Sequence, residues 1–342
     1  MRFRENRGYT DSKTQFTFPG KPLEKNQRQE GGNRMLYGII DIGSNTIRLT
    51  IYRVENGRFE ILFSEKVSAG LASFVTDGKM PLEGIHRASE ALCGFKKLLG
   101  NLSVERVSAF ATASLRNVSN TDEAVRKIET STGFSVEVLS GEEEARLDFA
   151  GAMASVDVQD GVLADIGGGS TELVAFENRA IKTALSLPIG SLSLHQKFVR
   201  KILPSGPEFR TMKTEIRKQI EDADLFAGAF PVICGVGGTA RAVLRISNYL
   251  FSLPAANTTV ASAQLRHLYQ VLKTGDQVAR NLILKTCPER IHTVLPGLLI
   301  LREVVRRYDG KTLVVSRYGV REGYLAERVI RAKGEHGENG RA

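Results

Sequence analysis

The sequence predicts an α/β protein built from two related lobes that face one cleft. Two observations lead to this prediction. Segments with the alternation typical of strands take turns with segments of helical period, as in layered α/β folds. One pattern also occurs twice, as IDIGSNTIRLT at residues 40–50 and ADIGGGSTELV at residues 164–174. A repeated unit of this kind indicates a second lobe built like the first.

The composition is that of a globular protein with room for two domains. The chain has 342 residues, of which 42% are hydrophobic and 25% charged. Its net charge of +9 favours a polyanionic partner such as a nucleotide, polyphosphate or nucleic acid. Three scattered cysteines without a CxxC favour reduced thiols in the cytoplasm. No apolar run approaches the ~20 residues that cross a bilayer.

Composition divides the chain into four parts. Residues 1–34 are rich in Lys and Arg and show no period, so we expect a disordered basic tail, or a translation start at Met35. The first lobe is expected over 35–145 and the second over 146–330. A polar tail follows at 331–342.

The expected elements of the first lobe begin with a buried strand, LYGIIDIG. Residues 46–67 then alternate on both sides of Asn56-Gly57, which is a strong hairpin signal. Further along, we expect a helix over 82–99, a strand over 106–114, a helix over 120–132 capped by Asn120, and a strand over 134–140.

The second half repeats this plan. GVLADIG predicts a strand, STELVAFENRAIKTALSL a hairpin, and FPVICGVGG a further strand, with several helices between and a long helical end. VLPGLLIL (294–301) is expected to start a buried helix, since it is too short to span a membrane.

Each copy of the repeat is a strand, a glycine turn and a returning strand. Successive N–H groups in such a turn bind anions, and neighbouring hydroxyls and amides add donors. A third turn, GVGGTAR (235–241), lacks the ending of a Walker A motif and the third glycine of a dinucleotide fingerprint. It suits further phosphate or a ribose, although a plain strand–helix turn is an alternative. The predicted phosphate-binding residues are Gly43, Ser44, Asn45, Thr46, Gly167, Gly168, Gly169, Ser170, Thr171, Gly237, Gly238 and Thr239.

Acidic residues flank these turns. Asp41, Asp165 and Glu172 would repel a phosphate unless a divalent cation lay between them. Hard oxygen ligands suit Mg²⁺, which usually bridges to substrate phosphates. We therefore expect these three residues to hold Mg²⁺, or Mn²⁺ in its place.

Three consecutive glutamates in LSGEEEARL (139–147) have different expected duties. Ser140 and Glu143 form a capping-box pattern at a helix start. Glu142 is expected to face the helix dipole as a first-turn acid. Glu144 has no such structural duty and is therefore free for chemistry.

Six motifs in one order resemble the exopolyphosphatase / guanosine pentaphosphate phosphohydrolase (Ppx/GppA) family: DIGSNT, ATASLR, LSGEEEARL, DIGGGSTE, GVGGT and VSRYGVREG. The resemblance covers about residues 36–330. It implies two ribonuclease-H-like lobes of the actin, sugar kinase and heat-shock chaperone superfamily, with the active site in the cleft between them. It also implies the short, two-domain form of the family.

What the resemblance implies about chemistry is removal of a terminal phosphate from polyphosphate, or of the 5′ γ-phosphate from pppGpp. Glu144 would activate water and Arg116 would bind phosphate. Asp165 and Glu172 would hold the metal, with Asp41 as a third candidate ligand. Arg317 stands where many members place an acid, so the preferred substrate stays open.

We expect an exopolyphosphatase. The alternatives are a pppGpp 5′-phosphohydrolase, or an alarmone or polyphosphate sensor without turnover. A kinase of the same superfamily fits less well, because a glutamate before Ala-Arg suits activation of water. No specific nucleic acid and no membrane partner are expected, and a homodimer is left open.

Overall fold

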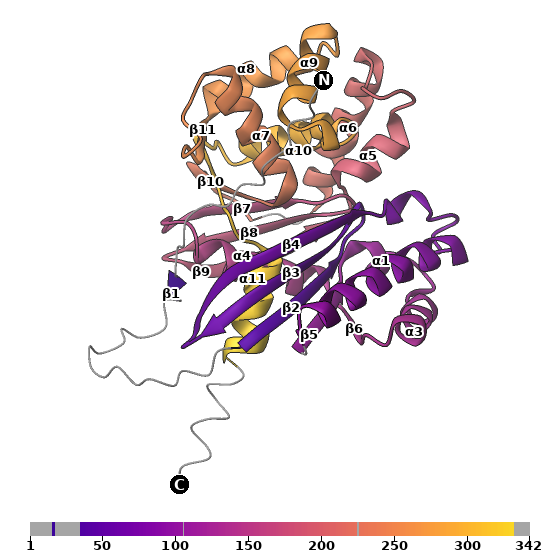
Figure 1. Cartoon of the computed structure of the whole chain (residues 1–342). Coiled ribbons are helices and arrows are strands. Elements are labelled where there is room, and N and C mark those ends of the chain that lie inside the picture. Colours follow the sequence, from indigo (N-terminus) through magenta and orange to yellow (C-terminus); the bar gives the residue numbers. More distant parts are fainter. Residues whose placement is uncertain (1–15, 18–34, 105, 224–225, 332–342) are drawn as a thin grey trace, which may run out of the picture.

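The computed structural model describes residues 16–17, 35–104, 106–223 and 226–331. Two six-stranded sheets lie side by side, and helices cover both (Figure 1). The predicted tails fall outside the described residues, apart from Phe16–Thr17 and Arg331. No helix in the described parts of the chain is long and apolar enough to cross a membrane.

The first sheet has the strand order β1-β4-β3-β2-β5-β6. The central strand β2 pairs antiparallel with β3 and parallel with β5. The predicted hairpin is confirmed, and Asn56 and Gly57 between its strands take φ values of 50° and 71°. The strands are β1 (Phe16–Thr17), β2 (Met35–Ile42), β3 (Thr46–Glu55), β4 (Arg58–Ser68), β5 (Arg106–Ala111) and β6 (Val136–Val138).

The second sheet has the order β11-β12-β10-β7-β8-β9 and repeats the plan of the first. Its central strand β7 pairs antiparallel with β8 and parallel with β10, as β2 does with β3 and β5. This duplication confirms the prediction of two ribonuclease-H-like lobes. The strands are β7 (Gly161–Ile166), β8 (Thr171–Glu177), β9 (Ala180–Leu187), β10 (Val232–Val236), β11 (Thr259–Ala261) and β12 (Thr312–Val315).

Helices pack on both faces of each sheet through apolar side chains. On one side of the first sheet lie η1 (Leu71–Ser73), α1 (Leu82–Asn101), α2 (Ala113–Arg116) and α3 (Thr121–Thr132). A larger helical layer packs on the second sheet and consists of α5 (Ser191–Phe198), α6 (Gly206–Asp222), α7 (Gly237–Leu250), α8 (Ser262–Leu272), α9 (Gln277–Thr286), η2 (Pro288–Arg290) and α10 (Val294–Arg307). Burial of these apolar faces supplies the main driving force of folding.

Two helices fill the space between the sheets. Helix α4 (Gly141–Met153) follows the first sheet in sequence but packs on the second, where Phe149 lies against Phe176. Helix α11 (Val320–Tyr324), continued by η3 (Leu325–Arg331), follows the second sheet but packs on the first, where Tyr324 stacks on Phe110. The lobe boundary that we expect after residue 145 stays a prediction. It falls within α4, and each lobe includes one helix from the other half of the chain.

Three local features differ from the sequence-based expectations. The strand expected over 106–114 ends at Ala111, and the chain then turns into the short helix α2, which carries Arg116. Asn120 does precede α3, but its side chain makes two hydrogen bonds to the backbone of Met80 and does not cap the helix. Similarly, the strand expected over 134–140 is limited to three residues, Val136–Val138.

Candidate active site

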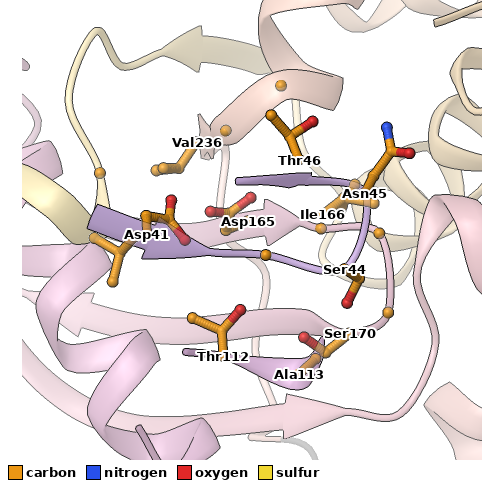
Figure 2. A pocket seen from close by; sticks show the side chains of 18 of the residues that line it. Asp41, Ser44, Asn45, Thr46, Thr112, Ala113, Asp165, Ile166, Ser170 and Val236 are labelled. Atoms are coloured by element: carbon orange, nitrogen blue, oxygen red, sulfur yellow. The ribbon is translucent and has the colours of Figure 1, made fainter. Parts of the chain in front are cut away.

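A pocket lies where the two lobes meet, and all three predicted glycine turns contribute to its wall. Figure 2 shows Ser44, Asn45 and Thr46 of the first turn and Ser170 of the second around it, with Asp41 and Asp165 on the adjoining strands. Ten of the predicted phosphate-binding residues line the pocket: Gly43, Ser44, Asn45, Thr46, Gly167, Gly168, Gly169, Ser170, Gly237 and Gly238.

The two repeated turns are closed in the same way. In the first, the Gly43 N–H donates to the Thr46 carbonyl at 3.1 Å; in the second, the Gly167 N–H donates to the Ser170 carbonyl at 3.0 Å. The turns also touch each other, because a Cβ on Gly169 would lie only 2.7 Å from Ser44 Oγ. The two glycine turns therefore face one another, as the repeat predicts, and anion binding by them stays a prediction.

Thr171 and Thr239, which we also predicted as phosphate-binding residues, do not line the pocket. Both side chains are buried, and their hydroxyls donate to backbone carbonyls, from Thr171 to Ile189 at 2.7 Å and from Thr239 to Ile166 at 2.8 Å. In this arrangement they fix the ends of the turns.

The third turn brings backbone close to a carboxylate. Gly237 has a φ of 75° and begins α7, and a Cβ at this position would collide with the Asp165 carboxylate. Only glycine allows both the left-handed conformation and the close approach. The turn therefore sets the position of Asp165 in the pocket.

Glu144 enters the site from the first turn of α4. The predicted capping box is present, since Ser140 and Glu143 satisfy each other's backbone N–H groups. Glu144 is then free to turn inward, where it is 8% exposed and accepts a hydrogen bond from Arg116 at 2.6 Å. Burial first, and the Glu172 carboxylate second, raise the pKa of Glu144 well above its usual range, while Arg116 lowers it.

Arg116 and Glu172, both predicted site residues, lie behind the pocket wall. Arg116 donates to the Leu139 carbonyl and to Glu144, and its Nη2 lies 3.4 Å from Glu172 Oε1. The same Glu172 oxygen accepts from Ser186 at 2.8 Å. Burial, and then the Asp165 carboxylate directly opposite on the neighbouring strand, raise the pKa of Glu172 to about 7.

Four arginines also line the pocket: Arg48, Arg241, Arg290 and Arg321. Sequence reasoning missed all four. Arg48 lies opposite Asp41 in the β2–β3 pairing, and Arg321 lies 3.9 Å from the Asp41 carboxylate. Arg241 and Arg290 have no side-chain hydrogen bond or ion pair to any described residue.

Burial and mutual repulsion disfavour the charged forms of Arg241 and Arg48. Burial first, and the neighbouring arginines after it, lower the pKa of Arg241 to about 10, so that its guanidinium is still charged at neutral pH. Burial likewise lowers the pKa values of Arg48 and Arg290. Two of these arginines could have been predicted as pocket residues from the motifs, because Arg241 follows GVGGT closely and Arg321 lies within VSRYGVREG. The sequence around Arg290 contains no such motif. Arg317, in contrast, is exposed and does not line the pocket.

The acidic residues of the pocket fit a divalent cation that is bound partly by the protein and partly by a substrate. Asp41, Asp165 and Glu144 line the pocket together with Asp148, which sequence reasoning missed. Three or more acidic, His or Cys side chains do not converge into a ready-made metal cluster anywhere in the described chain. Mg²⁺, however, commonly takes one or two carboxylates and completes its shell with water and phosphate oxygens. The buried and mutually repelling carboxyl groups of this wall meet that requirement.

Fold and site together define a two-lobed protein in which repeated glycine turns face each other at a pocket lined by arginines and acids. Comparison with known sequences makes this class specific. The chain belongs to the Ppx/GppA phosphatase family, which it matches over residues 50–332.

Relatives with assigned names are similar over most of this chain. Exopolyphosphatase 1 of Mycobacterium tuberculosis is 25% identical over 309 residues, which cover 86% of this chain and 88% of that protein. A bifunctional 3-dehydroquinate synthase/phosphatase of Fusobacterium nucleatum is 26% identical over 312 residues, 87% of this chain, but the match spans only 47% of that longer protein. The family and its exopolyphosphatase members indicate a phosphoanhydride hydrolase.

Solved structures share the fold. A Ppx/GppA family member from Aquifex aeolicus has a TM-score of 0.71 at 25% identity, covering 87% of this chain and 99% of that one. An exopolyphosphatase from Cytophaga hutchinsonii has a TM-score of 0.76 at 24% identity, with 87% and 98% covered.

Proposed function

We propose that this protein is an exopolyphosphatase that removes the terminal phosphate of inorganic polyphosphate by metal-assisted attack of water. The observation that carries the proposal is that acidic and basic side chains line one pocket beside the facing glycine turns. Glu144 and the aspartates Asp41, Asp148 and Asp165 lie there together with the four arginines. A terminal phosphoryl group would meet the acids, while the following phosphates would meet the arginines.

The turns and the arginines bind and orient the substrate. Backbone N–H groups of the facing turns, with the Ser44 and Ser170 hydroxyls, would hold the terminal phosphoryl oxygens. The guanidinium groups of Arg241 and Arg290 would donate to the next phosphates, for which their planar donor geometry is suited. Fixed donors of this kind supply most of the catalysis in phosphoryl transfer.

Glu144 is the proposed general base. Its Oε2 accepts the hydrogen bond from Arg116, which leaves Oε1 to accept a proton from water. The water oxygen bonds to phosphorus as the bridging P–O bond breaks, and the shortened chain leaves with the bridging oxygen. Arg116, held by the Leu139 carbonyl, keeps the Glu144 carboxylate in place. The sequence-based role of Arg116 as a phosphate ligand would require it to exchange one of these partners.

The proposed metal ligands are Asp165 and Asp41 in the pocket wall, with Glu172 beneath it. When bound, Mg²⁺ or Mn²⁺ would neutralise charge on the phosphoryl oxygens and on the carboxylates. Glu172, which is 1% exposed, is otherwise occupied by Ser186 and Arg116, so its contribution would be through the charge that it places next to Asp165.

The test is phosphate release from long-chain polyphosphate, tripolyphosphate and pppGpp, each with and without Mg²⁺. Metal-dependent release from polyphosphate, absent in Glu144→Gln, is expected. Release from pppGpp but not from polyphosphate would replace the proposal with a 5′-phosphohydrolase. Binding of these compounds without any turnover would indicate a sensor.

A further inference from the structure

One carboxylate in the pocket wall has no partner that explains it. Asp148 is 0% exposed, and within the described chain neither of its side-chain oxygens has a hydrogen-bond donor. An ionised carboxyl group buried in this way costs several kcal/mol unless a cation or donors compensate it. Buried unsatisfied groups are rare in native proteins, and an unseen ion is one of the few explanations.

The position of Asp148 is set by the helix that carries the proposed base. It follows Glu144 by four residues on α4, so both side chains project from the same face. Both line the pocket. Asp148 Oδ1 also lies against the backbone at the start of α11, 3.0 Å from where a Cβ on Gly319 would be. The carboxylate is therefore packed rigidly into the wall and is not a mobile surface acid.

The groups around Asp148 are mostly acids. Burial first, and then the carboxylates of Asp165, Glu144 and Glu172, raise the pKa of Asp148 well above its usual range. Its carboxyl group faces that of Asp165, and when both are ionised neither can donate to the other. Two explanations can make such a pair stable: a proton shared between the two groups, or a cation bound by both.

We propose that Asp148 is a further ligand of the divalent cation, bound together with Asp165. This inference rests on the metal-assisted part of the proposed function and names a ligand outside the glycine turns. The pocket favours the cation, because Asp148 and Asp165 both border it and a cation bound there would lie beside both, and Asp165 is held in place by the Gly237 turn. Two carboxylates also match the number that Mg²⁺ sites commonly take from protein.

The experiment is a titration of the full-length, metal-free protein with Mn²⁺ in the absence of substrate, followed by electron paramagnetic resonance of the free ion. Asp148→Asn and Asp148→Ser are compared with the wild type. The matched control is Glu142→Gln, an exposed acid on the same helix that pairs with Arg146 at 2.9 Å. Each titration is repeated with inorganic phosphate, and the melting temperature of each metal-free variant is measured.

We expect both Asp148 variants to bind Mn²⁺ at least about tenfold more weakly, since loss of even an indirect partner of a metal commonly costs 10–100-fold. Glu142→Gln should bind as the wild type does. Without metal, Asp148→Asn should melt at or above the wild-type temperature, because a buried charge without a partner is removed.

Wild-type Mn²⁺ affinity in both Asp148 variants would overturn the proposal and favour the shared proton, since the side-chain amide introduced by Asp148→Asn can donate to Asp165 in place of that proton. Absence of a saturable Mn²⁺ site in the wild type, with and without phosphate, would overturn it as well. Because no substrate is turned over in these titrations, their result is independent of the phosphate-release assay. Mn²⁺ binding through Asp148 in a protein that releases no phosphate would reject only the proposed function.

Discussion

Arg116 Nη1 donates to Glu144 Oε2 at 2.6 Å, and its Nη2 lies 3.4 Å from Glu172 Oε1. One guanidinium thus joins an acid at the start of α4 to an acid on β8 of the second sheet. The pair controls the charge of Glu144, because the Arg116 guanidinium lowers a pKa that burial and Glu172 raise.

Arg116→Gln should move the acid limb of the pH profile of kcat/KM to higher pH. A general base works only when deprotonated, so activity falls as pH decreases through the pKa of Glu144. Loss of the Arg116 charge removes an influence that lowers this pKa, and the limb shifts upward. Arg116→Lys, which keeps the charge, should shift it less. An unchanged limb in Arg116→Gln would show that the titrating base is another group.

Glu144→Gln should lower kcat by roughly 10²–10⁴-fold, the usual contribution of a general base, while substrate binding is retained. The amide keeps the shape but cannot take the proton from water. Single-turnover and binding measurements with polyphosphate separate the two effects.

Glu143→Gln is the matched control, because glutamine can serve in the capping box that Glu143 forms with Ser140. The exposed ion pair of Glu143 with Arg328 at 3.2 Å contributes little. If the Glu143 variant were inactive and the Glu144 variant active, the assignment of the base would be wrong by one residue.

Arg241→Ala should reduce kcat/KM for polyphosphate by about 10- to 150-fold, since hydrogen bonds to charged groups contribute roughly 1.5–3 kcal/mol. Arg241 lines the pocket near Asp165 and makes no side-chain hydrogen bond or ion pair within the described chain. Arg245→Ala is the control: this arginine lies one turn further along α7, is exposed, and pairs with Glu289 at 2.7 Å. Equal effects of the two changes would mean that Arg241 acts only through overall charge.

Removal of divalent metal should abolish phosphate release, and Mg²⁺ or Mn²⁺ should restore it. The pocket wall carries Asp41, Asp148 and Asp165, which repel a polyphosphate unless a cation neutralises them. Phosphate release is measured in EDTA, after dialysis, and after each metal is added back. Full activity in EDTA, in protein shown by elemental analysis to be metal-free, would contradict the proposed mechanism.

Local sequence was sufficient to predict the glycine turns and the start of α4. The repeat predicted two equivalent turns, and the same backbone hydrogen bond closes each, from Gly43 to Thr46 and from Gly167 to Ser170. The capping box at Ser140 was predictable because both of its partners lie within one helical turn. These features depend on neighbours in the chain, and the structure bears them out.

The pocket arginines and Asp148 could not be predicted in this way, because their surroundings depend on contacts between distant segments. Arg48 looks like an ordinary strand residue until the packing of the lobes brings Arg241 and Arg290 to the same pocket. Asp148 looks like an ordinary polar position on a helix, but in the folded chain it is fully buried and lies against Gly319 at the start of α11. Asn120 is a case in which a local prediction failed for the same reason. Its side chain bonds to the backbone of Met80 and therefore does not cap α3.

The exchange of helices between the lobes has a mechanical consequence. The chain crosses from one lobe to the other twice, once into α4 and once into α11, and the two helices touch backbone to backbone, since a Cβ on Gly323 would collide with the Leu147 carbonyl. Any rotation of one lobe relative to the other would have to bend the chain at these two adjacent helices, which we call the hinge helices. Glu144 lies on one of the hinge helices and Arg321 on the other. Residues close to the axis of such a rotation move least, so a rotation of the lobes would leave Glu144 and Arg321 near their present separation and would change mainly the distance between the facing glycine turns at residues 43–46 and 167–170.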